Sequence, residues 1–431
     1  MTTGTGPELG QAVTGTPDTP LAEGAGTLTG AAGAVGQGLT EGDATAVVAP
    51  PRHTSPLLRR RGAVAGAGPD AGVAWHYGDP TAEQRALTRG GAVVDQSHLG
   101  VVRVAGPDRL TWLHSITSQH LTDLAPRTST ELLVLSPQGH VEHAAGVVDD
   151  GEATWLITEG AHAPTLAAWL DRMRFTLRVE VADVTDDWAA IGEPVSAEGA
   201  EGEPITWRDP WPHTAPGGTR YGPDDAQHPG LDRAWRLVLV PRAELAEAVA
   251  AREAAGWPLV GTWASEAVRV EAWRPRLGRE VDHRSIPHEL DWLRTAVHLV
   301  KGCYRGQETV ARVHNLGRPP RRLVMLHLDG SGHLLPEPGA EVRELGDLAN
   351  GGQAGRAVGQ VTSVARHHEL GPVALAVVKR STPVDAELVV DCDGGAVAAG
   401  QEVVVAGEGV SADRPAARGP LTRGLGQRPS L

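Results

Sequence analysis

Apolar residues along the chain occur either at helical spacing or in short runs of strand length. The order of these two patterns predicts the class of fold. Between residues 163 and 175, Leu166, Leu170 and Met173 recur at the spacing of an amphipathic helix. Further helices are predicted at 81–87, 108–116 and 242–255, and strands at 92–95, 101–104, 131–136, 141–148, 154–158 and 235–240. Antiparallel strand pairs with helices laid against them predict an α+β domain.

From residue 321 the pattern changes to short apolar runs between glycine-rich turns. Runs of strand length lie at 323–328, 358–365, 373–378 and 387–390. Short strands in this arrangement are typical of a small barrel or sandwich. We therefore expect a separate C-terminal β-domain at 321–405, after a larger domain at 73–320.

Three segments show neither spacing. Residues 1–72 are a mixture of Gly, Ala, Thr and Pro with almost no large apolar side chains, so they cannot bury enough surface to offset the entropy that ordering costs. We expect a disordered N-terminal tail there, a flexible insertion in the larger domain at about 193–231, and a disordered C-terminal tail at 406–431.

The balance of acidic and basic residues limits the classes of partner that the protein is expected to bind. The chain carries 53 acidic and 39 basic residues, and its formal net charge is −14. Such a protein repels polyanions, so we expect neither direct nucleic-acid binding nor membrane binding. The sequence lacks a secretory signal and any run of about 18 apolar residues, which predicts a cytoplasmic location.

The chain has two cysteines, Cys303 and Cys392, and neither lies in a metal-ligand spacing. This excludes a disulfide scaffold and, on one chain, a four-thiolate metal site. We therefore expect no metal.

The pattern at 298–312 predicts a strand, a tight turn and a helix, and Cys303 lies in its central segment, 301–308. Gly302 and Gly306 flank the turn and allow a sharp bend. The thiol would lie near the start of the helix and near Lys301, one of only two lysines in the chain, and both features favour a reactive thiolate. The alternative is a small buried hydrophobic residue, and the residues alone leave both open.

The same segment resembles the signature of the YgfZ proteins at every fixed position. The matching residues are Lys301, Gly302, Cys303, Tyr304, Gly306, Gln307 and Glu308. The likeness spans about 75–404, and its N-terminal part is similar to the T-protein of glycine cleavage, an aminomethyltransferase that uses tetrahydrofolate. The resemblance implies a T-protein-like folate-binding domain with a small C-terminal β-barrel, and a pterin cavity at the centre of the larger domain.

One departure from the T-proteins bears on activity. His143 and Ala144 stand where T-proteins carry an acidic pair, and Arg236 aligns loosely with a T-protein glutamate. Aminomethyl transfer then lacks its acid–base group. The resemblance implies an accessory protein that binds tetrahydrofolate or a derivative and supports iron–sulfur enzymes, and through them tRNA modification. Its partners would be iron–sulfur client or assembly proteins, and its working residues Cys303 and Lys301.

Two alternatives remain, a folate-dependent aminomethyltransferase and a cysteine-nucleophile enzyme without folate. Three further residues are candidate folate contacts. Arg269 matches a T-protein arginine expected to meet the carboxylate tail of folate, although an ion pair with Glu266 or Glu271 is an equal alternative. Asp123 is a candidate ligand contact or a turn cap. Trp112 lies opposite the apolar face of its helix and is a candidate to stack on a pterin.

Overall fold

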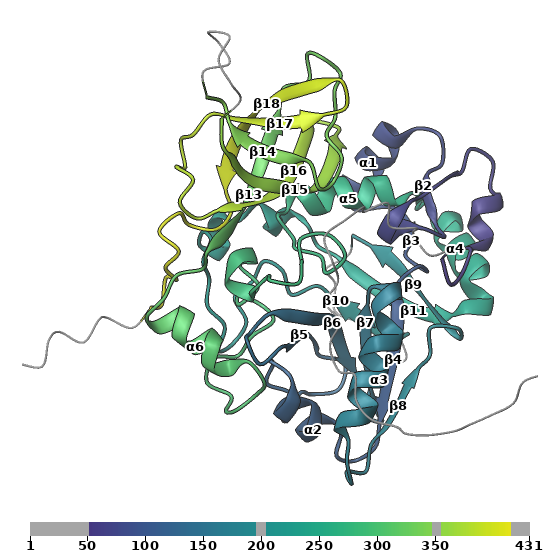
Figure 1. Cartoon of the computed structure of the whole chain (residues 1–431). Helices are drawn as coiled ribbons and strands as arrows, with labels where there is room; N and C mark the ends of the chain where they lie inside the picture. Colours follow the sequence, from purple (N-terminus) through teal and green to yellow (C-terminus); the bar gives the residue numbers. More distant parts are fainter. Residues whose placement is uncertain (1–50, 195–203, 347–354, 415–431) are drawn as a thin grey trace, which may run out of the picture. The chain divides into compact units, whose positions relative to one another are not determined.

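The computed structural model describes residues 51–194, 204–346 and 355–414. Its first sheet has five antiparallel strands and carries helices α2 (Arg109–Ile116) and α3 (Ala163–Met173) (Figure 1). Apolar side chains of both helices, such as Leu113 and Leu166, share a buried cluster with Val102 and Leu132 of the sheet. In sheet order the strands are β5 (Ser129–Leu135), β6 (Val141–Asp149), β7 (Ala153–Thr158), β4 (Gly100–Ala105) and β8 (Glu180–Asp183).

The second sheet also has five strands, antiparallel except for the parallel pair β12–β3. In sheet order they are β10 (Thr206–Arg208), β11 (Arg236–Pro241), β9 (Trp188–Glu193), β3 (Val93–Asp95) and β12 (Leu259–Val260). Helices α1 (Pro80–Thr88), α4 (Leu245–Ala254) and α5 (Thr262–Glu271) pack around it. A buried cluster joins Val148 and Ile157 of the first sheet to Ala190 and Leu237 of the second. The two sheets therefore pack face to face.

The C-terminal part is a closed six-stranded barrel. In order around the barrel its strands are β13 (Arg321–Leu328), β16 (Gly371–Lys379), β15 (Ala357–His367), β14 (Glu341–Glu344), β17 (Leu388–Cys392) and β18 (Gly395–Val403). Helix α6 (Gln307–Asn315) precedes it, and β15 packs against α5. The predicted class, α+β with a C-terminal β-barrel, is confirmed.

The N-terminal prediction needs correction. Disorder was expected to residue 72, but η1 (Pro56–Arg59), β1 (Val64–Ala65) and η2 (Gly68–Asp70) precede β2 (Ala74–His76), which pairs with β1. Leu57 packs into a core cluster with β3, β9 and α4 residues. This single anchored leucine and the pairing of β1 with β2 order a segment that is otherwise poor in apolar residues. The remainder of the predicted tail, 1–50, lies outside the described residues.

Other boundaries differ as well. In the expected insertion at 193–231, residues 195–203 lie outside the described part of the chain, but 204–231 are built into the domain: β10 pairs with β11, and Trp211 and Tyr221 are buried. Within the expected C-terminal tail, 406–414 are described and Ala406 bonds to the backbone of Tyr221. The strand expected just before residue 301 is instead a series of turns. Within the described residues no helix is long and apolar enough to cross a membrane.

Candidate functional site

A cavity of about 140 Å³ lies between the two sheets. Strands β6 and β7 contribute Ala144, Gly146 and Thr158 to its wall, and α5 contributes Glu266 and Arg269. Pockets that enclose drug-sized ligands usually measure ~300–1,000 Å³. Only part of such a ligand would fit inside this cavity as the side chains stand.

The polar wall of the cavity consists of paired charges. Four carboxylates face four arginines, and the pairs are Glu131–Arg274 at 2.6 Å, Asp209–Arg233 at 2.7 Å, Glu159–Arg276 at 2.7 Å and Glu266–Arg269 at 3.0 Å. Burial alone would raise the pKa of Glu266, but Arg269 and Arg276 outweigh it and hold that pKa at about 2. Glu266 is therefore ionised at neutral pH, and an arginine engages each of the four carboxylates.

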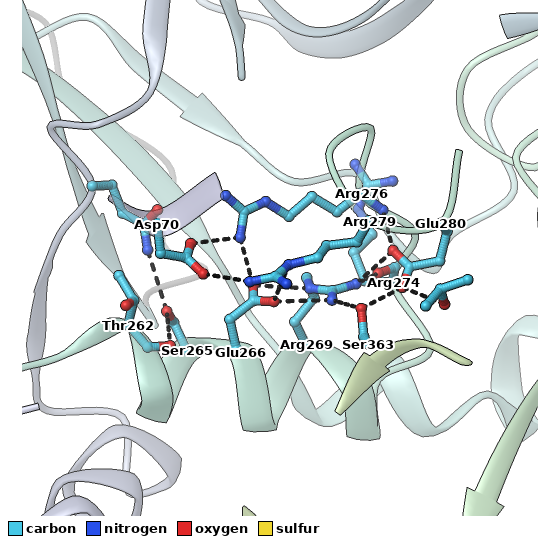
Figure 2. Close-up of polar contacts among 12 residues, drawn as sticks. Asp70, Thr262, Ser265, Glu266, Arg269, Arg274, Arg276, Arg279, Glu280 and Ser363 are labelled. Carbon is cyan, nitrogen blue, oxygen red and sulfur yellow. Dashed lines mark hydrogen bonds and ion pairs between the residues drawn. The ribbon is translucent and has the colours of Figure 1, made fainter. Parts of the chain in front are cut away.

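The ion pairs continue beyond the cavity on both sides (Figure 2). Toward the N-terminal segment, Asp70 accepts from Arg276 at 2.7 Å and from Arg279 at 2.8 Å. Toward the barrel, Arg269 donates to Ser363 of β15 at 2.6 Å. Arg269 also donates to Glu280 at 3.0 Å. One buried network thus joins the N-terminal segment, α5 and the barrel.

The segment 301–308 lies at the surface, away from the cavity wall. Its two glycines have positive φ angles, +103° at Gly302 and +84° at Gly306, where side chains other than glycine are strained. Gly306 is the N-cap of α6, so the predicted tight turn and helix start are confirmed. The thiol of Cys303 is exposed. The buried-hydrophobe alternative for Cys303 is therefore wrong.

Lys301 is largely buried and anchors this segment to α2. Its Nζ donates to the backbone oxygens of His114 and, at 2.7 Å, of Thr117, at the C-terminal end of the helix. The same ammonium lies 4.9 Å from the ring centre of Tyr304. Burial lowers the pKa of Lys301 to about 8, although the neighbouring Cys303 opposes the shift. A cation at a helix C-terminus is a favourable arrangement.

A row of histidine rings borders the Lys301 anchor. The ring of His120 lies 4.7 Å from that of His114 and 5.2 Å from that of His298. Burial lowers the pKa of His114 and of His298. Among the described residues, no three His, Cys, Asp or Glu side chains are grouped so as to hold a metal ion.

Tyr304 connects the segment to the cavity. Its ring is buried in the same core cluster as Ala144 and Trp292, which both line the cavity. Cys303 and Lys301 do not line it. Tyr304 thus links the segment that carries Cys303 to the cavity wall through a shared core cluster.

The structure places the three candidate folate contacts in different environments. Arg269 lines the cavity, but its guanidinium is engaged by Glu266 and Glu280, so the ion-pair alternative is present in buried form. Asp123 is exposed and lies 3.4 Å from His120, outside the cavity wall. Trp112 is a core residue whose indole donates to the backbone oxygen of Met173. The structure does not bring Asp123 or Trp112 to the cavity.

Sequence reasoning missed most of the cavity wall, including Glu131, Arg274, Arg276 and Trp292. The only signal was the density of arginines in the proline- and glycine-punctuated segment from residue 274. That signal names no partner, because Glu131 lies 143 positions from Arg274.

Known proteins resemble this chain in sequence and in structure. Residues 57–192 match the family model of the GCVT N-terminal domain. An aminomethyltransferase from Moorella thermoacetica is 28% identical over 330 residues, which are 71% of this chain and 83% of the relative. A putative chloroplastic transferase from Arabidopsis thaliana is 26% identical over 273 residues, 60% of each protein.

The glycine cleavage system aminomethyltransferase T from Bartonella henselae has a similar structure. Its crystal structure superposes with a TM-score of 0.63 at 17% sequence identity, covering 81% of this chain and 95% of that one. At this identity the likeness shows the fold alone. The chain therefore has a GcvT-like fold.

Proposed function

We propose that the protein binds a reduced folate in the cavity between its sheets and serves, through the thiol of Cys303, as an accessory protein in the assembly or repair of iron–sulfur enzymes. The observation that carries this proposal is the pairing of every cavity carboxylate with an arginine. The wall can bind a ligand, but it has no carboxylate free to exchange protons with one.

Aminomethyl transfer needs a group that moves a proton at the reacting amine. Glu266 stays ionised because its pKa is about 2. His143 occupies the position where T-proteins carry an acidic residue, and burial, helped by the nearby His162, lowers its pKa to about 4. A histidine with so low a pKa is a weak base at neutral pH. Binding without aminomethyl transfer is therefore favoured.

The cavity wall suits the ring of a pterin. Three indoles, those of Trp207, Trp235 and Trp292, line it and offer flat apolar faces. Because the volume is small, the ring would enter and the glutamate tail would remain outside. These indoles and the polar wall groups would hold the folate, which when bound supplies a carrier for one-carbon units.

The exposed thiol supports a role toward another protein. Cys303 projects from a turn that Lys301 and two glycines fix in place, and Tyr304 reaches the cluster behind the cavity. A ligand in the cavity and a protein partner at Cys303 would thus be linked through Tyr304 and the core cluster that it shares with Ala144 and Trp292. The iron–sulfur role itself follows from the resemblance of this segment to the YgfZ signature.

The role of the thiol is tested in cells of the source organism that carry Cys303→Ser. We expect the activity of cluster-dependent enzymes to fall several-fold. Cys392→Ser is the matched control, because this second cysteine lies half-buried in the barrel, far from the proposed site in sequence, and it should leave those activities unchanged. Equal activities in both strains would overturn the proposal.

Folate binding is tested separately by isothermal titration with tetrahydrofolate. Ala144→Leu adds bulk to the cavity wall and should abolish binding, whereas Ala251→Leu, on an exposed position of α4, should not. Binding that survives Ala144→Leu would place the folate elsewhere.

The second candidate function is aminomethyl transfer of the T-protein type. It is favoured by the similarity to the Moorella thermoacetica aminomethyltransferase across most of that protein. Purified protein given an aminomethyl donor and tetrahydrofolate would release ammonia and form methylene-tetrahydrofolate if this function holds. Measurable turnover would displace the accessory role.

A further inference from the structure

We propose that Arg274 and Trp292 form a subsite that binds a neutral carbonyl-type oxygen of the ligand. The inference rests on the proposed folate binding and names the part of the ligand that enters the cavity. Both residues line the cavity, and both are more than nine-tenths buried.

Each of the two side chains has one hydrogen-bond donor without an acceptor. Arg274 donates through Nε to Asp209 at 3.1 Å and through Nη2 to Glu131 at 2.6 Å, but its Nη1 has no partner. The indole Nε1 of Trp292 is likewise buried and without a partner. Buried donors are normally paired in folded proteins, so two such donors in one cavity wall indicate a ligand that accepts.

The neighbouring indole of Trp207 shows the contrast. It also lines the cavity, but its N–H donates to the backbone oxygen of Thr130 at 2.6 Å. Its donor is already satisfied within the protein. The unpaired donors are thus a local feature of Arg274 and Trp292 and do not extend to every indole of the wall.

The guanidinium of Arg274 is held in place. Its two carboxylate partners fix two of its three nitrogens, and Asp209 is held in turn by Arg233. The ring centres of Trp211 and Trp292 lie 5.4 and 5.8 Å from the guanidinium carbon. Ion pairs and ring contacts together fix the guanidinium and leave Nη1 as its nitrogen without a hydrogen-bond partner.

The charges of the cavity wall favour a neutral ligand atom as the acceptor at Arg274 Nη1. The four carboxylates and four arginines of the wall balance, and Arg274 already contacts two carboxylates. A ligand carboxylate at Nη1 would approach Glu131 and Asp209 and be repelled by both. A neutral lactam oxygen accepts from the same donors without that repulsion. For a folate, this means the pterin carbonyl rather than the glutamate carboxylates.

The test compares three probes by titration calorimetry with the full chain. They are a tetrahydropterin that keeps the ring carbonyl, a 2,4-diamino analogue in which an amino group replaces that carbonyl, and p-aminobenzoylglutamate. The wild type should bind the tetrahydropterin about fivefold to tenfold more tightly than the diamino analogue, the effect of about one hydrogen bond. It should not bind p-aminobenzoylglutamate in the cavity.

Trp292→Phe removes one donor and keeps the ring, so it should lose much of this discrimination. Arg274→Lys keeps the positive charge but removes the planar set of guanidinium donors. It provides a second measurement of the discrimination if Trp292→Phe folds poorly. Trp112→Phe, in the core and outside the cavity, should discriminate like the wild type. Equal discrimination by Trp292→Phe and wild type, or competition between p-aminobenzoylglutamate and the pterin, would overturn the subsite while folate binding stands. Failure of tetrahydrofolate and all probes to bind would overturn both proposals.

Discussion

The ammonium of Lys301 contacts two backbone oxygens at the end of α2 and the ring of Tyr304. Two of its three N–H donors therefore have acceptors within the protein, and the ammonium also lies near an aromatic ring. A free catalytic amine would instead leave at least one direction open to a substrate. We infer that Lys301 positions the turn that carries Cys303, and that the thiol acts on its own.

Replacing Lys301 by methionine should lower the free energy of unfolding by about 1–3 kcal/mol, because the carbonyls of His114 and Thr117 lose a charged donor. Urea unfolding measures the loss, and hydrogen exchange should speed up at residues 301–308. The other lysine gives a matched control: Lys379 also donates to a backbone oxygen, that of Ala357, but is exposed, so Lys379→Met should cost less than about 0.5 kcal/mol. Equal losses in the two variants would contradict the anchoring role.

At the scale of elements, the start of α6 depends on close backbone contact. A Cβ on Gly306 would lie 2.6 Å from the backbone oxygen of Ser136 and 3.1 Å from the Cα of Gly139. A Cβ on Gly302 would meet no atom within 4 Å, although both glycines have positive φ. The two positions thus share backbone strain and differ in crowding.

This difference predicts unequal effects of alanine. Gly302→Ala should cost about 1–2 kcal/mol from the backbone conformation alone. Gly306→Ala should cost clearly more, because α6 must also move away from the turn at Ser136. Thermal and urea unfolding of the two variants provide the comparison. Similar costs would mean that the contact at Ser136 relaxes easily.

Elements with strong local spacing were predictable from the sequence. The helix α3 and the strands β5, β6 and β13 all lie within a few residues of their expected ranges. The strand β18 was missed because its residues, Gly395–Val403, are mostly small and give no apolar alternation. The strand β14 is only four residues long and lacks a recognisable pattern.

The site was predictable only where it is local. The turn at Cys303 follows from Gly302 and Gly306, which are close in sequence. The cavity wall combines residues from distant segments, and its chemistry depends on which carboxylate meets which arginine. Such pairing is a property of the packed sheets, so the sequence could not reveal the unpaired donors of Arg274 and Trp292.

At the scale of the whole molecule, the buried ion-pair network ties three separate parts of the chain together. Asp70 belongs to the N-terminal segment, Glu266 and Arg269 to α5, and Ser363 to the barrel. Arg276 contacts both Asp70 and Glu266, and Arg269 contacts both Glu266 and Ser363, as Figure 2 shows. Removing one charge from such a network leaves its partner buried without compensation.

Asp70→Asn should therefore destabilise the protein by about 3–5 kcal/mol, since Arg276 and Arg279 lose a buried carboxylate. Asp171→Asn, which breaks an exposed pair with Arg174, should cost at most about 0.5 kcal/mol. Urea unfolding measures both changes, and hydrogen exchange locates them. If the network acts as one unit, exchange in Asp70→Asn should rise in β15 as well as around residues 64–76. A change confined to the N-terminal segment would mean that Arg269 holds the barrel independently of Asp70.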